Sequence, residues 1–83
     1  MNWQLVVAKS AKKALKDLPA KDRLRVERAL DALQRDPFSG DIKRLEPPAW
    51  RRRVGNYRIF YDLFLEQHLM VVTAIRRRTT TTY

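Results

Sequence analysis

The chain has 83 residues and a net charge of +9, with 18 Lys and Arg, nine Asp and Glu, one His and no Cys. This length fits one domain spanning residues 1–83. Without cysteine the chain has neither a disulfide scaffold nor a thiolate metal site, and a single histidine argues against a His-rich metal cage or a Ser–His–Asp triad. Because no apolar run reaches the roughly 20 residues of a membrane span, and the first residues do not resemble a signal peptide, we expect a cytoplasmic protein.

The first part of the sequence predicts one strand followed by two helices. Residues 3–8 alternate in polarity, which is typical of a strand. Ser10 is a favourable N-cap for a helix over residues 11–18, in which apolar side chains recur at helical spacing. Pro19 separates this helix from a second one over residues 20–35, which the following Asp-Pro pair terminates.

The second part of the sequence has the period of strands. We expect strands at residues 42–45, 50–54, 57–65 and 69–75, and we place the last at the centre of the sheet because it is the most apolar. A Gly-Asn pair after residue 54 predicts a two-residue type II′ hairpin turn. The order β-α-α-β-β-β-β indicates an α+β fold, with two N-terminal helices packed on a mostly antiparallel, curved sheet.

The positive charge is concentrated in the second half of the chain. Residues 43–83 carry nine basic and three acidic side chains, and every basic residue after position 43 is arginine. Arginine binds phosphate through two parallel hydrogen bonds and stacks on bases. The charge therefore predicts a polyanionic partner, either nucleic acid or an acidic protein. The alternative is a basic protein whose charge serves only solubility.

The predicted hairpin brings several arginines onto one face of the sheet. Its two-residue turn places Arg53 opposite Arg58 and Arg51 opposite Phe60, so these four side chains share a face. Neighbouring like charges repel, so this arrangement favours a surface that binds phosphates while Phe60 holds a base. The alternative is a solvated outer face. Arg52 falls on the opposite, apolar face, where it either extends to water at the rim or marks an irregular strand.

Four segments resemble the RelE branch of the RelE/ParE toxin superfamily. They are residues 10–19, residues 36–45, residues 50–61 (WRRRVGNYRIFY) and the ending at residues 75–83, and together they cover essentially the whole chain. Residues 50–61 are the most specific part. The resemblance implies a RelE-like toxin domain from a type II toxin–antitoxin pair. It further implies an endoribonuclease, without metal or cofactor, that cuts messenger RNA in the ribosomal A site by attack of the 2′-hydroxyl on the adjacent phosphate.

The resemblance also implies the residues of the site. Carried over position by position, the catalytic roles fall on Arg51, Arg53, Arg58, Arg77 (or Arg78) and the final Tyr83. The further RNA-binding candidates are Lys43, Arg44, Phe60, Arg76 and Arg78.

One departure from the family pattern affects the expected chemistry. Better-studied members carry lysines where this chain has Arg51 and Arg53. A lysine with a lowered pKa can act as a base but an arginine cannot, so we interpret both as stabilisers of charge on the phosphorane. The sequence does not identify the group that removes the 2′ proton. The candidates are the phenolate of Tyr83, Glu46, solvent and ribosomal RNA.

The expected partners are the ribosome, messenger RNA and a cognate antitoxin whose acidic or amphipathic segment covers the RNA site. Three alternatives remain open. The first is a ParE-like DNA gyrase poison without nuclease activity, and the second is a toxin-like chain that has lost its catalysis. The third is a non-catalytic RNA-binding domain, although the double-stranded RNA-binding fold ends in a helix and this chain is expected to end in a strand.

Overall fold

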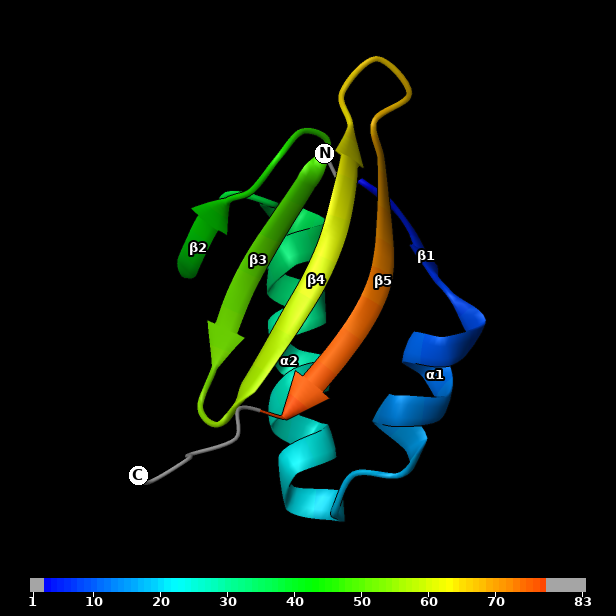
Figure 1. Ribbon diagram of the computed structural model, residues 1–83, viewed down its shortest axis with the longest axis vertical. Coiled ribbons are helices and arrows are strands. Elements are labelled where there is room, and N and C mark those ends of the chain that lie inside the picture. The colour runs from blue at the N-terminus through cyan, green and yellow to red at the C-terminus, as the bar shows by residue number, and fades with distance from the viewer. Residues whose placement is uncertain (1–2, 78–83) are drawn as a thin grey trace.

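The computed structural model describes residues 3–77, and its elements follow the predicted order (Figure 1). The elements are β1 (Gln4–Val7), α1 (Lys9–Lys16), α2 (Ala20–Arg35), β2 (Asp41–Arg44), β3 (Ala49–Val54), β4 (Tyr57–Phe64) and β5 (Leu69–Arg77). The fold class is therefore the predicted α+β arrangement. Within these residues, no helix combines the length and the apolar character needed to cross a membrane.

The five strands form one sheet in the order β1-β5-β4-β3-β2. The pair β1–β5 is parallel and the other three pairs are antiparallel, as expected for a mostly antiparallel sheet. The central strand is β4, so the placement of the strand at residues 69–75 in the centre was wrong. That strand, β5, is interior, but only β1 lies beyond it, whereas β3 and β2 both add to the other side of β4.

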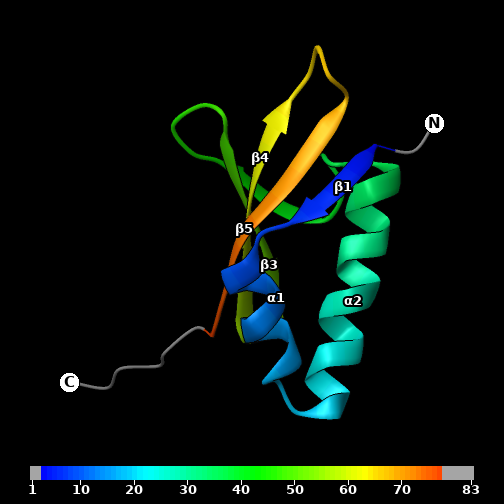
Figure 2. The ribbon, with the colours of Figure 1, turned by 90° about the vertical axis from the view of Figure 1, so that its right-hand side faces the viewer.

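Both helices cover one face of the sheet and leave the other face open (Figure 2). The helices contribute an apolar stripe to the core, as their spacing predicted. Its buried members are Ala11, Val26, Ala29, Leu30 and Leu33. The sheet contributes alternate residues of β4 and β5, together with the end of β3. These are Val54, Tyr57, Ile59, Tyr61, Leu63, Met70, Val72 and Ile75.

The start of α1 differs from the prediction. The helix begins at Lys9, and its N-cap residue is Ala8, which makes no side-chain capping bond. The Ala8 N–H donates to the carbonyl of Val72 at 2.8 Å, so the chain turns into the helix directly after its last bond to β5. Ser10 therefore lies inside the first turn, and its hydroxyl donates to the Thr73 carbonyl at 3.5 Å.

The two hairpins that build the open face differ in regularity. Between β3 and β4, Gly55 has a φ of +56° and Asn56 has no positive φ, as a type II′ turn requires. Between β4 and β5 the ladder contains a bulge, because Phe60 pairs with Ala74 and Tyr61 with Val72. Thr73 is the extra residue and has no partner in the ladder.

Candidate nucleic-acid interface

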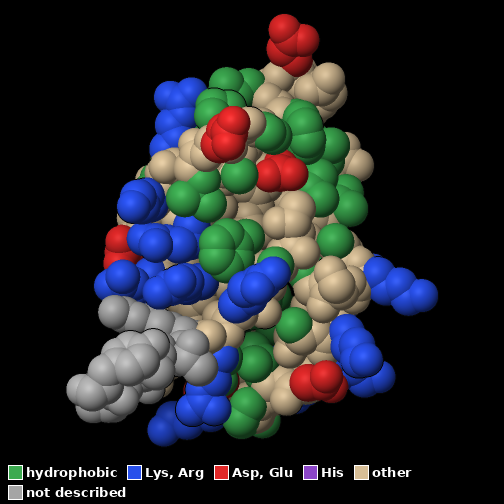
Figure 3. Space-filling model, viewed as in Figure 1, with side chains coloured by type: hydrophobic (Ala, Val, Ile, Leu, Met, Phe, Trp, Pro, Cys, Tyr) green, Lys and Arg blue, Asp and Glu red, His purple; other side chains and the backbone are tan. Residues whose placement is uncertain are grey.

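Basic side chains form rows across the open face of the sheet. One row follows the paired residues Asp41, Arg53, Arg58 and Arg76 from β2 to β5. The next row follows Lys43, Arg51, Phe60 and Ala74. We call the surface made by Lys43, Arg51, Arg53, Arg58, Phe60 and Arg76 the basic face. Figure 3 shows this side of the molecule, with Lys and Arg side chains gathered where β2 and β3 lie.

The arginines of the basic face retain hydrogen-bonding capacity. Arg53 lies 3.9 Å from the Asp41 carboxylate, which is the one ion pair within 4 Å in residues 3–77. The Nε atoms of Arg51, Arg53 and Arg58 are buried and have no hydrogen-bond partner in this part of the chain, and the same holds for that of Arg52 on the helix side of the sheet. Buried donors on charged side chains normally find an acceptor, and phosphate oxygens match the guanidinium geometry. The electrostatics of this face therefore suit a phosphodiester.

Phe60 lies in a shallow hollow on the same face. Its partner on β5 is the small residue Ala74, and Ala49, which pairs with Asp62, also lines the hollow, so the ring stays partly exposed. Arg58 and Arg76 also line the hollow. An aromatic ring between guanidinium groups offers a stacking surface for a base next to donors for its phosphate.

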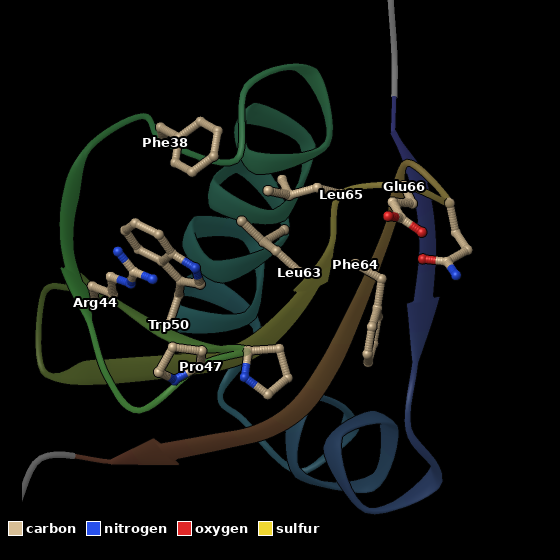
Figure 4. Close-up of a pocket in the computed structure, with 10 residues that line it drawn as sticks. Phe38, Arg44, Pro47, Trp50, Leu63, Phe64, Leu65 and Glu66 are labelled. Atoms are coloured by element: carbon tan, nitrogen blue, oxygen red, sulfur yellow. The ribbon is translucent and has the colours of Figure 1, made fainter.

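Two of the predicted site residues lie on the other side of the sheet. Arg44 pairs with Trp50, and both line an apolar pocket that also includes Phe38, as Figure 4 shows. Arg77 pairs with Tyr57, whose side chain is buried toward the helices. Neither side chain joins the basic face. Arg78 and Tyr83 lie outside the residues that the structure describes.

Arg52 fits neither of the two interpretations that its position left open. Its Nη1 donates to the carbonyl of Ala29 in α2 at 3.3 Å and to the Ser39 hydroxyl at 3.5 Å. The turn at Gly40, with a φ of +81°, packs so closely that an added Cβ would lie 2.7 Å from the guanidinium. Arg52 therefore links β3 to the helix layer, and sequence periodicity alone cannot reveal such a contact.

Two tyrosines fix β4 against the helix layer beneath the basic face. The Tyr57 hydroxyl donates to the Asp22 carboxylate at 2.7 Å, and this bond, together with burial, raises the pKa of its phenol above 10.0. The Tyr61 hydroxyl donates to the Pro37 carbonyl at 2.8 Å, and burial raises the pKa of that phenol to about 12. These bonds hold the strand that carries Arg58 and Phe60.

One residue of the open face was missed at the level of sequence. Asp62 follows Arg58 and Phe60 at alternate positions of β4, so its side chain lies on the same face. It places a half-buried carboxylate beside the basic rows. The same strand alternation that places Arg58 and Phe60 on this face also predicts Asp62 there.

Comparison with known proteins identifies the family. Residues 5–81 match the family described as the ParE toxin of the type II toxin–antitoxin system parDE. The chain belongs to this family. It is accordingly a type II toxin of the RelE/ParE superfamily. A curated relative, the candidate toxin RelE1 of Methanocaldococcus jannaschii, is 28% identical in an alignment that covers 94% of this chain and 92% of the relative.

Solved structures show the same fold. RelE in the archaeal RelE–RelB complex from Pyrococcus horikoshii superposes with a TM-score of 0.86 at 24% identity, covering 98% of this chain and 100% of that one. The isolated RelE toxin of E. coli gives a TM-score of 0.83 at 18% identity, covering 95% and 87% of the two chains. These likenesses confirm the RelE-like arrangement of two helices on one face of an open sheet.

Proposed function

We propose that this toxin cuts messenger RNA in the ribosomal A site. The observation that carries the proposal is the cluster of Arg51, Arg53, Arg58 and Arg76 on an open sheet face, with Nε donors of Arg51, Arg53 and Arg58 that have no partner in residues 3–77. Neighbouring arginines such as Arg53 and Arg58 disfavour the sheet unless an anion lies between them. A phosphodiester bound here would satisfy both the charge and the free donors.

The proposed reaction is an internal transesterification. The 2′-oxygen forms a bond to the adjacent phosphorus, and the bond from phosphorus to the 5′-oxygen of the next nucleotide breaks. The products are a 2′,3′-cyclic phosphate and a 5′-hydroxyl, so one proton leaves the 2′-oxygen and one reaches the 5′-oxygen. Arg51, Arg53 and Arg58 stabilise the extra negative charge of the phosphorane and align the reacting groups.

Proton transfer needs a group other than these arginines, because a guanidinium stays protonated. The candidates within this chain for the group that accepts the 2′ proton are Tyr83 and Glu46. The candidates outside the chain are solvent and ribosomal RNA. Glu46 is exposed in the loop between β2 and β3. Arg51 and Arg53 therefore contribute to the proposed reaction by stabilising negative charge, and they do not transfer protons.

We further propose that a cognate antitoxin covers the basic face. The similar archaeal RelE is known in complex with RelB. The net charge of +9 favours a partner segment that carries carboxylates. Such a segment would occupy the same donors as RNA, so antitoxin and RNA would exclude each other.

The test is primer extension on a messenger RNA under translation in a purified system. Wild-type toxin should produce cuts within codons, and the naked transcript should stay intact. Arg58→Gln should lower the cleavage rate by about 100-fold, the scale expected when one donor to the transition state is lost. Arg28→Gln, which removes the same charge from an exposed position on α2, should cut like the wild type. Cleavage by Arg58→Gln at the wild-type rate would contradict the proposal.

A second candidate function is inhibition of DNA gyrase, because the matching family is described by ParE. In this case the toxin would stop growth without cutting RNA. Incubation with gyrase and supercoiled plasmid distinguishes the two, since a gyrase poison leaves linear DNA after protein removal. Linear DNA together with intact messenger RNA would replace the ribonuclease proposal.

A further inference from the structure

Strand β5 ends in two consecutive arginines, Arg76 and Arg77, and the position of a bulge determines which of the two lies on the basic face. Met70 and Val72 are fully buried toward the helices. Strict alternation from Val72 onward would also direct Ala74 and Arg76 toward the helices. Ile75 and Arg77 would then face outward with Arg58.

The bulge at Thr73 reverses this pattern. After the unpaired Thr73, Ala74 pairs with Phe60, Ile75 with Ile59 and Arg76 with Arg58. Ile75 is buried at 7% exposure, and Arg76 is exposed on the basic face.

Specific bonds hold the bulge in place. The Thr73 hydroxyl donates to the Phe60 carbonyl at 3.2 Å, and the Thr73 carbonyl accepts the Ser10 hydroxyl at 3.5 Å. The core also favours the bulge, because it buries the larger side chain of Ile75 in place of Ala74 and keeps the Arg76 guanidinium out of the apolar layer. Both the polar contacts and the packing therefore select the same register.

We infer that, of the two arginines in β5, Arg76 and not Arg77 contacts RNA phosphate, and that the Thr73 bulge positions it. This inference rests on the proposed function. Arg53, Arg58 and Arg76 then form one row across three neighbouring strands, each about 5 Å from the next. Three guanidinium groups at that spacing form a continuous binding strip for a single-stranded backbone.

Arg77 has a different environment. It pairs with Tyr57, whose hydroxyl is bound to Asp22 on α2. The positive charge of Arg77 acts on that phenol and partly offsets the rise in its pKa. The pairing with Tyr57 therefore places Arg77 on the helix side of the sheet, opposite to the basic face.

The register can be tested without RNA, because the chain has no cysteine of its own. Residues directly opposite on antiparallel strands lie within the Cα range of a disulfide. Under mild oxidation the double variant Arg58→Cys/Arg76→Cys should form an intramolecular disulfide. The matched variant Arg58→Cys/Arg77→Cys should remain reduced, because its second thiol lies on the other face. The opposite outcome, or equal oxidation of both variants, would overturn the assignment.

The functional part is tested by RNA binding in a series of salt concentrations. The probe is a fluorescent single-stranded RNA with 2′-O-methyl riboses, which cannot be cut by 2′-hydroxyl attack. Arg76→Gln should reduce the slope of log Kd against log salt by about 0.7, the value for one lost phosphate contact on a single strand. Arg58→Gln should have the same effect, and Arg77→Gln, an identical change one residue along, should keep the wild-type slope.

The outcomes separate the inference from the proposed function. If Arg58→Gln lowers the slope and Arg76→Gln does not, the inference is wrong and the RNA site stands. If Arg77→Gln lowers the slope as much as Arg76→Gln, the face assignment is wrong. If wild-type protein and Arg58→Gln bind this RNA equally, or neither binds, both the inference and the RNA-binding site are overturned.

Discussion

Removal of the Tyr61 hydroxyl should destabilise the toxin at neutral pH and change its response to alkali. The Tyr61 side chain is fully buried, and its hydroxyl donates to the Pro37 carbonyl at 2.8 Å. Tyr61→Phe loses this bond and leaves a buried carbonyl without its donor, which costs about 1–3 kcal/mol. For a domain of this size, each kcal/mol lowers the melting temperature by about 4–8 °C.

The alkaline response follows from the pKa of the same phenol. Folding raises it from 10.0 to about 12, so the folded state favours the protonated phenol. The corresponding stability is fully present below pH 10 and is lost as the pH rises through 12. One pKa unit corresponds to about 1.4 kcal/mol, so wild type should lose roughly 2–3 kcal/mol that Tyr61→Phe does not have.

Urea unfolding of both proteins, followed by far-UV circular dichroism from neutral pH to pH 12, measures this difference directly. All other side chains are the same in both proteins, so their effects cancel in the comparison. The stability gap between wild type and Tyr61→Phe should narrow above pH 10 and approach zero or change sign near pH 12. A gap that stays constant with pH, or a variant as stable as wild type at neutral pH, would refute the reasoning.

Four further substitutions test the packing and the division between the two sheet faces. Leu33→Ala should cost about 2–5 kcal/mol in urea unfolding, because Leu33 is fully buried between α2 and the sheet. Gly40→Ala should cost about 1–3 kcal/mol in the same assay, because its φ is +81° and the new Cβ would meet the Arg52 guanidinium. An unchanged urea midpoint would contradict this expectation. Arg52→Gln should lower the melting temperature and keep wild-type RNA binding, because Arg52 bonds to the helix layer. Its neighbour Arg51→Gln should keep the melting temperature and weaken RNA binding. Identical changes in both variants would contradict the assignment of these residues to opposite faces.

The features that the sequence predicted correctly depend on short stretches of chain. The hairpin register follows from a Gly-Asn turn and strand alternation, so the opposition of Arg53 and Arg58 needed no knowledge of the rest of the fold. The buried stripe of α2 follows from helical spacing in the same way. The order of the elements and the fold class rest on these local periods.

The features that the sequence left open or predicted wrongly depend on contacts between distant segments. The position of β5 beside β1 requires pairing between the two ends of the described chain. The contact of Arg52 with Ala29 crosses from sheet to helix, and the pocket beside Arg44 is formed by several loops and strand ends. Alternation within one strand contains no information on such neighbours.

The sequence by itself determined that this chain makes two helices and a meander, and that one face of the sheet collects arginines. The tertiary structure alone decided which arginine of the last strand joins that face. Ile75 is buried in the core where strict alternation would bury Ala74, and the extra residue Thr73 in the bulge makes this shift possible. The physical reason is that burial is a property of the assembled core, so it can shift the alternation of a strand by one residue and move Arg76 to the surface that Arg77 would otherwise occupy.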